Sequence, residues 1–159
     1  MDRVMMKVGN EALAFYKVGK KAYNDNIKKI NNNPEEAVYG LIVAIVNLAF
    51  SIELCLKTFI DETESKKCKH DLKKLFNMID ETYQKELIKA LIKQFSQFGS
   101  VIDEQTFWEY LDNNKNAFEH WRYYYQNNDN ADVTFLYSMA TVLKNFVSKI
   151  KEGLNRISN

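Results

Sequence analysis

The sequence predicts an all-α protein built as one helical bundle. Only one proline and five glycines interrupt its 159 residues, and no segment sustains the alternation of apolar and polar residues that strands need. Apolar residues recur instead every three or four positions along most of the chain. A chain of this length is expected to form a single domain, residues 1–159, and to bury roughly 70% of the surface of its unfolded state.

Two long helices are expected in the first third of the chain. The first covers about residues 4–30 and ends in a run of asparagines before Pro34. Asn33 is expected to cap the second helix, because an asparagine side chain accepts hydrogen bonds from free amides and proline suits the first helical position. This second helix is expected to continue to about residue 61.

An uncharged run at residues 37–52 lies inside the second predicted helix and begins like a membrane span. It is too short, because a span needs about 20 apolar residues. The run contains Asn47 and Ser51, and it continues directly into Glu53 and Lys57. We therefore expect no membrane span here, but a central helix that neighbouring helices cover on nearly every side.

Further helices are expected after a charged loop at residues 61–69. Each carries apolar residues at helical spacing, and Gly99 marks a break between two of them. They cover about residues 70–80, 84–95, 103–113, 113–130 and 132–157.

The charge balance excludes a general attraction to nucleic acid or anionic lipid. Lysine and arginine total 22 against 21 aspartates and glutamates, so any RNA binding must come from a local patch. Most lysines are typical of solvated helix faces. The densest cluster is the predicted phosphate-contacting patch, and it consists of Lys66, Lys67, Lys69, Lys73 and Lys74.

The cysteines and the amino terminus indicate a cytoplasmic protein. Cys55 and Cys68 have no metal-ligand partners at a useful spacing, and two such cysteines fit a reducing compartment. The amino-terminal residues are interrupted by charges and lack the apolar stretch of a secretion signal. We expect no export, no metal and no cofactor.

Glu53 and Lys57 are four residues apart, acid before base, and so share one helix face. On a solvated helix such a pair contributes only about 0.2–0.5 kcal/mol. Here the pair follows the apolar run, so the Glu53 carboxylate is expected to be partly buried and to need a further cationic partner. Arg122 is the predicted partner, because its planar guanidinium fits a carboxylate and the chain has only two other arginines.

The segment at residues 113–130 concentrates aromatic and basic side chains, including His120, Trp121 and Arg122. On one regular helix His120 and Arg122 point about 200 degrees apart, so another helix or a second chain would have to complete a shared site. Trp121 and Tyr125 are expected to pack in the bundle.

The other histidine, His70, precedes a predicted helix, where a surface or capping role is the more common one. Our hypothesis is instead that His70 completes a polar seam with Glu53 and Arg122. The sequence shows no glycine-rich phosphate loop, no Ser/His/Asp set and no histidine–acid spacing for a metal.

Three segments together resemble the HEPN superfamily of helical-bundle domains. They are "SIELCLK" at residues 51–57, "HDLKKLF" at 70–76 and "HWRYYY" at 120–125, and they are similar to an uncharacterised bacterial branch with SIELxLK, HDLxxLF and WRYxY motifs. The resemblance covers about residues 37–126. It implies an up-and-down bundle of four main helices plus short helices, frequent homodimers and, in active members, metal-independent RNA cleavage in toxin–antitoxin and phage-defence systems.

The chain departs from the catalytic pattern of those active members, in which an arginine is followed four to six residues later by a histidine in a cleft between two protomers. No histidine follows Arg122 at that spacing, and His120 precedes it. Loss of a general acid–base group removes a factor of about 10²–10⁴ in rate. Glu53 is expected to orient Arg122, which keeps its ability to bind phosphate.

The sequence therefore predicts an HEPN-like binding or regulatory module without catalysis that forms a homodimer and binds RNA, a nucleotide or an antitoxin-type protein. One alternative is a metal-independent endoribonuclease that uses Arg122 with His120 or His70 across a dimer cleft. Another is a nucleotide-binding domain with a pocket of tyrosines near Arg122.

Overall fold

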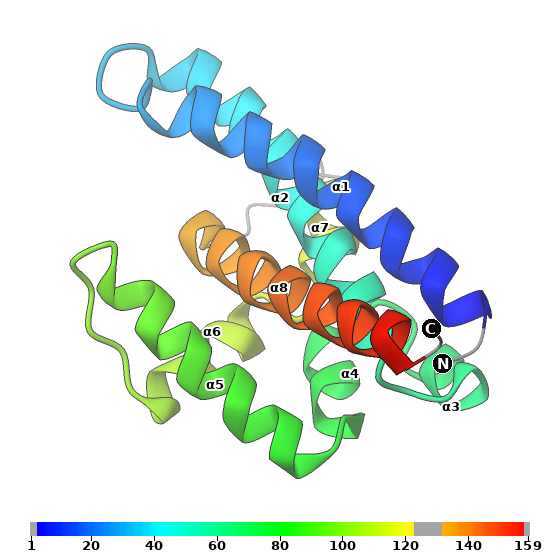
Figure 1. Cartoon of the computed structure of the whole chain (residues 1–159). Coiled ribbons are helices and arrows are strands. Elements are labelled where there is room, and N and C mark those ends of the chain that lie inside the picture. Colours follow the sequence, from blue (N-terminus) through cyan, green and yellow to red (C-terminus); the bar gives the residue numbers. More distant parts are fainter. Residues whose placement is uncertain (1–2, 123–131, 158–159) are drawn as a thin grey trace.

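The computed structural model describes residues 3–122 and 132–157, and the side chains of residues 7–122 and 132–152 (Figure 1). No strand occurs in these residues, so the predicted all-α helical bundle is confirmed. The helices are α1 (Arg3–Ile27), α2 (Pro34–Lys57), α3 (Glu62–Lys67), α4 (Leu72–Met78), α5 (Glu81–Ser96), α6 (Glu104–Asn113), α7 (Ala117–Arg122) and α8 (Val133–Ile157).

The long helices α1 and α2 form an antiparallel hairpin whose closed end extends beyond the other helices (Figure 1). Asn33 caps α2 as predicted, because its side chain accepts a hydrogen bond from the Glu36 amide at 3.3 Å. The two helices approach closely at Gly19, where a Cβ would lie 2.8 Å from the Leu48 side chain and 3.0 Å from its backbone nitrogen. Only glycine, which has no Cβ, allows α1 and α2 to lie this close together.

The core is built around α2, which packs between α1 and α8. In the described part of the chain α2 alone is long and apolar enough to cross a membrane. In the bundle, however, 56% of its most apolar stretch is buried, and Leu48 and Ile52 have no exposed surface. The first half of α2 is less covered, because Val38, Tyr39 and Val43 are exposed, so the expectation that neighbouring helices cover it on nearly every side holds only for its second half.

The remaining helices complete the core around α8. Phe76, Phe107 and Phe135 come from α4, α6 and α8 and are almost fully buried. Their rings lie 5.2–6.2 Å apart between centroids, the separation of aromatic pairs that attract beyond simple burial. These ring contacts join the short helices α4 and α6 to the long helix α8.

Some predicted boundaries were wrong at helix ends. The helix α1 ends at Ile27 and α2 at Lys57, earlier than the predicted residues 30 and 61, because a turn follows each. The helix α5 begins at Glu81 rather than residue 84, since the Asp80 side chain accepts a hydrogen bond from Thr82 and caps it.

The predicted loop at residues 61–69 contains a helix, α3, which the sequence reading missed. The Asp61 side chain caps it by accepting a hydrogen bond from the Thr63 amide at 2.9 Å. The helix α7 occupies only residues 117–122 of the helix predicted at 113–130, and the rest of that prediction from residue 123 lies outside the described residues.

Candidate functional site

A buried carboxylate, that of Glu53, lies near the end of α2 with only 1% of its side chain exposed. One oxygen, Oε1, accepts a hydrogen bond from Lys57 Nζ at 2.6 Å. The other, Oε2, lies 2.8 Å from His70 Nδ1. A buried carboxylate needs such partners, and here both of its oxygens have one.

The partners of Glu53 lie at the edge of the bundle. The side chains of Lys57 and His70 are 25% and 32% exposed. Because an ionised carboxylate only accepts hydrogen bonds, Nδ1 of His70 is the donor in this contact, and the second ring nitrogen, Nε2, remains for a further partner. Lys57 and His70 therefore present an ammonium group and an oriented imidazole to solvent.

His70 is held in place by a short, well-bonded turn between α3 and α4. Lys69, immediately before it, has a φ of 51°, a left-handed conformation that reverses the chain direction. Asp71, immediately after it, caps α4 with its side chain. The Leu72 amide donates to the Lys115 carbonyl at 2.9 Å, which ties the turn to the segment before α7.

An aromatic ring on α7, that of Phe118, connects this turn to Arg122. Its centroid lies 5.0 Å from that of the His70 ring and 4.6 Å from that of Phe50, on which it stacks. The Arg122 guanidinium carbon lies 5.1 Å from the Phe118 centroid, within the range of a cation–π interaction. We call Lys57, His70 and Arg122 the basic cluster.

The predicted ion pair between Arg122 and Glu53 is wrong. Among the described residues, the groups that contact the Glu53 carboxylate are Lys57 and His70, and no ion pair joins it to Arg122. The turn before α4 places His70 beside the Glu53 carboxylate, where Arg122 was expected. The part of the hypothesis that placed His70 beside Glu53 agrees with the structure.

The aromatic residues predicted to pack were Trp121 and Tyr125. Trp121 is half-buried and packs against the core, whereas Tyr125 lies outside the described residues. Phe118 was not selected from the sequence. Its position four residues before Arg122, on the same helix face, was the signal that would have identified it.

The predicted phosphate-contacting patch is largely neutralised by neighbouring acids. Four of its lysines lie within 3.5 Å of a carboxylate oxygen, and the fifth, Lys69, is exposed. Attraction to phosphate is weaker where carboxylates alternate with lysines. The ion pairs are Lys66–Glu62, Lys67–Glu64, Lys73–Asp112 and Lys74–Asp71.

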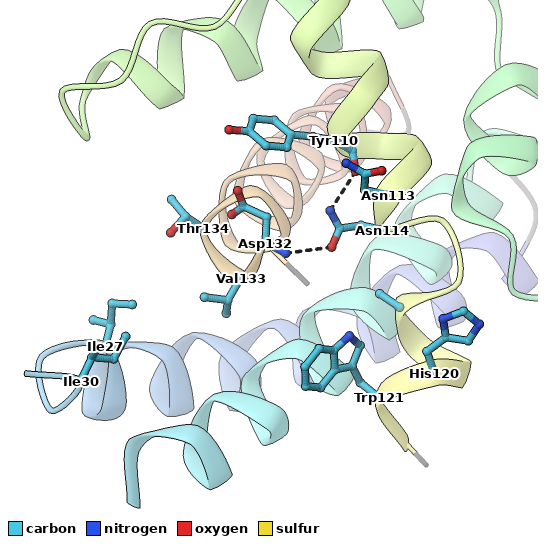
Figure 2. A pocket seen from close by; sticks show the side chains of 11 residues that line it. Ile27, Ile30, Tyr110, Asn113, Asn114, His120, Trp121, Asp132, Val133 and Thr134 are labelled. Carbon is cyan, nitrogen blue, oxygen red and sulfur yellow. Dashed lines mark hydrogen bonds between the residues drawn. The ribbon is translucent and has the colours of Figure 1, made fainter. Parts of the chain in front are cut away.

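An open pocket of about 710 Å³ lies on another side of α7 (Figure 2). The side of the pocket that is lower in the view is apolar and includes Ile27, Ile30 and Trp121. Val133 lies between this apolar side and a polar side opposite it. His120, which is exposed, also lines the pocket. A volume of this size is within the range of small-molecule sites.

The opposite side of the pocket is polar. Tyr110, Asp132 and Thr134 lie there, and Asn113 lies to their right in the view, next to Asn114 at the end of α6 (Figure 2). Asp132 caps α8, because its Oδ1 accepts from the Phe135 amide at 2.8 Å.

This polar side is held by the buried side chain of Asn114. Its Nδ2 donates to the Tyr110 carbonyl at 2.8 Å, and its Oδ1 accepts from the Asp132 amide at 3.1 Å (Figure 2). The end of α6 and the beginning of α8 are therefore joined.

Two other features bear on chemistry. Burial raises the pKa of the Cys55 thiol to about 12, so this thiol is neutral and unreactive near pH 7. In the part of the chain that the structure describes, no group of three histidine, cysteine, aspartate or glutamate side chains is placed to hold a metal ion.

Comparisons with family models, with curated proteins and with solved structures find no match for this chain.

Proposed function

We propose that the chain is an HEPN-like module that binds RNA through its phosphates at the basic cluster, and that it lacks the usual ribonuclease motif. The observation that carries the proposal is the buried Glu53 carboxylate, whose two oxygens hold Lys57 and His70 at the edge of the bundle. Arg122 lies over the ring that His70 also contacts. Glu53 fixes the orientation of the two side chains that it holds, and Arg122 supplies the positive charge that attracts an anion.

Phosphate is the anion that these groups fit best. The guanidinium of Arg122 is exposed and presents a planar fork of donors that matches phosphate oxygens. The charge of Lys57 is partly balanced by Glu53, so Lys57 contributes further N–H donors rather than a free charge. The net charge of the whole chain is only +1. Binding is therefore expected to be local and sensitive to substitution of a single base.

The test is fluorescence anisotropy of a labelled single-stranded RNA with the wild type and with Arg122→Gln. Loss of one charged contact is expected to weaken binding by about tenfold or more, since such a bond contributes about 1.5–3 kcal/mol. The matched control is Lys17→Gln, which removes an exposed positive charge on α1. Equal affinities for the two variants would contradict the proposal.

A second candidate function is metal-independent RNA cleavage, which the 2.8 Å contact between His70 Nδ1 and Glu53 favours. In this reaction His70 Nε2 takes the proton of a ribose 2′-hydroxyl as the O2′–P bond forms. The P–O5′ bond breaks, and the released 5′ oxygen takes a proton from water. Glu53 fixes the imidazole tautomer, and Arg122 neutralises the phosphate.

This candidate is tested by incubating RNA with the purified protein in a metal chelator. A 2′,3′-cyclic phosphate product that disappears in His70→Gln and Arg122→Ala, but persists in His120→Ala, would establish cleavage through His70. Loss of cleavage only in His120→Ala would place the acid–base group on α7 instead. No cleavage by the wild type would leave RNA binding as the function.

The resemblance to the HEPN superfamily also supports a cytoplasmic homodimer with an antitoxin-type protein partner, in a toxin–antitoxin or phage-defence system. We expect a mass of twice 18.7 kDa in light scattering of the purified chain. A monomer at all concentrations would contradict the dimer.

A further inference from the structure

An open groove of about 280 Å³ lies between α5 and α8, which run side by side and antiparallel (Figure 1). Its floor is apolar and consists of Ala90, Val142 and Phe146. Val142 is buried, and the other two are half-buried against the core. The groove shares no residue with the basic cluster or with the pocket beside α7.

The rim of the groove is polar and carries a positive charge from each helix. Lys93 on α5 and Lys149 on α8 line it and are exposed. The side-chain amides of Gln94, Gln97 and Asn145 line it as well, although the Asn145 oxygen already accepts a hydrogen bond from a lysine. A glutamine amide has both donors and an acceptor, so this rim can pair with the N–H and C=O groups of a peptide backbone.

The charges of the two rim lysines are not neutralised by described carboxylates. The ion pairs in this part of the chain join other lysines, and no aspartate or glutamate lines the groove. Glu86 on α5 and Glu152 on α8 are exposed and lie within ion-pair distance of neither Lys93 nor Lys149. The rim is therefore positive and attracts an acidic ligand.

The shape of the groove favours a segment of a larger molecule over a free small molecule. Its volume is below the roughly 300–1,000 Å³ of small-molecule sites. A peptide is favoured over RNA, because the single ring of the groove, Phe146, lies in the floor, whereas single strands bind to exposed aromatic platforms. An apolar floor, amides and lysines together match an apolar side chain, a peptide backbone and carboxylates.

We propose that the groove between α5 and α8 binds an acidic peptide segment of another protein. One large apolar side chain of this segment lies on the floor beside Ala90, and carboxylates on either side of it contact Lys93 and Lys149. The glutamines of the rim bond the peptide backbone. The proposal rests on the groove alone and does not depend on RNA binding at the basic cluster.

The probe is a phage-displayed library of short random peptides. It is selected in parallel on the wild type, on Lys93→Gln/Lys149→Gln and on the control Lys17→Gln/Lys28→Gln. All four lysines are exposed, so both double variants are expected to fold, and thermal melting verifies this. The control removes the same charge from α1 and the turn after it.

Peptides with acidic residues on both sides of one large apolar residue are expected to be enriched on the wild type and the control. A labelled synthetic peptide of the enriched sequence is then titrated by fluorescence anisotropy. Lys93→Gln/Lys149→Gln is expected to bind it about tenfold more weakly, since each exposed ion pair contributes up to about fivefold. Ala90→Leu, which fills the floor without changing the charge, is expected to weaken binding about fivefold or more, because less apolar surface of the peptide is buried.

The inference is overturned if no peptide is enriched on the wild type, if the enriched peptides are not acidic, or if Lys93→Gln/Lys149→Gln binds the peptide as the control does. Loss of binding of single-stranded RNA in that variant, without peptide binding by the wild type, would assign the groove to RNA and also overturn it. Failure of the proposed function is read separately, from the effect of Arg122→Gln on RNA affinity.

Discussion

Replacing the buried carboxylate by an amide, in Glu53→Gln, tests the physical basis of the site. The substitution keeps the shape of the side chain but removes the charge that accepts hydrogen bonds from Lys57 and His70. Hydrogen bonds to charged groups contribute about 1.5–3 kcal/mol each. Both partners are a quarter to a third exposed, so water recovers part of this loss, and we expect a net destabilisation of about 2 kcal/mol.

The assay is thermal unfolding followed by circular dichroism at pH 7. For a chain of this size about 2 kcal/mol corresponds to a decrease in Tm of about 4–8 °C. The control is Glu86→Gln, an exposed glutamate on α5, for which a change within about 0.5 kcal/mol is expected. A Tm for Glu53→Gln within 2 °C of the control, on the order of the error of this conversion, would refute the reasoning.

A double-mutant cycle with His70→Gln then isolates the contact between the two side chains. Residues in direct contact show coupling energies of about 0.5–3 kcal/mol. We expect coupling near the middle of that range. Strictly additive losses would show that the 2.8 Å contact contributes nothing to the fold.

Three further predictions follow from the packing and the titrating groups. Gly19→Ala is expected to destabilise the protein by about 1–3 kcal/mol in urea unfolding, because its Cβ would meet the Leu48 backbone; unchanged stability would mean that α1 and α2 separate easily. Burial raises the pKa of both thiols, Cys55 and Cys68, so neither should react with a thiol reagent at pH 8 until the protein unfolds. Hydrogen bonds from Thr82 hold the pKa of Asp80 below its ordinary 3.8, so its stabilising effect is complete above pH 3.8 and is lost as the pH falls through the lower folded-state pKa. Thermal melts from pH 5 to pH 2 should therefore show a weaker acid dependence for Asp80→Asn, which still caps α5 but does not titrate.

Local sequence signals predicted the long helices well. Asn33 before Pro34 marked the start of α2, and the uncharged run at residues 37–52 identified a helix whose second half lies in the core, whereas Val38, Tyr39 and Val43 in its first half are exposed. These features are encoded within a few residues of one another. The helix α3 was missed because its residues carry no apolar period, and its signals are a capping aspartate, glutamates in the first turn and lysines in the last.

The site was only partly predictable, because its contacts join distant parts of the chain. Glu53 and Lys57 are neighbours on one helix, and their pairing followed from spacing. The further partner of Glu53 was predicted to be Arg122 by side-chain type, with His70 placed beside them as a hypothesis, and in the structure the turn before α4 brings His70 to the second oxygen. The pocket combines residues from the α1–α2 hairpin, α6, α7 and the beginning of α8, and no motif in any one of them indicates it.

The central claim is that the basic cluster around Glu53 binds RNA phosphates. The most direct measurement is the dependence of RNA affinity on salt concentration for the wild type, Arg122→Gln and Lys17→Gln. Each phosphate contact adds about 0.7 to the slope of log K against log salt for single strands. We predict that Arg122→Gln lowers the magnitude of that slope by about 0.7 and that Lys17→Gln leaves it unchanged. The same slope for all three proteins would contradict the claim.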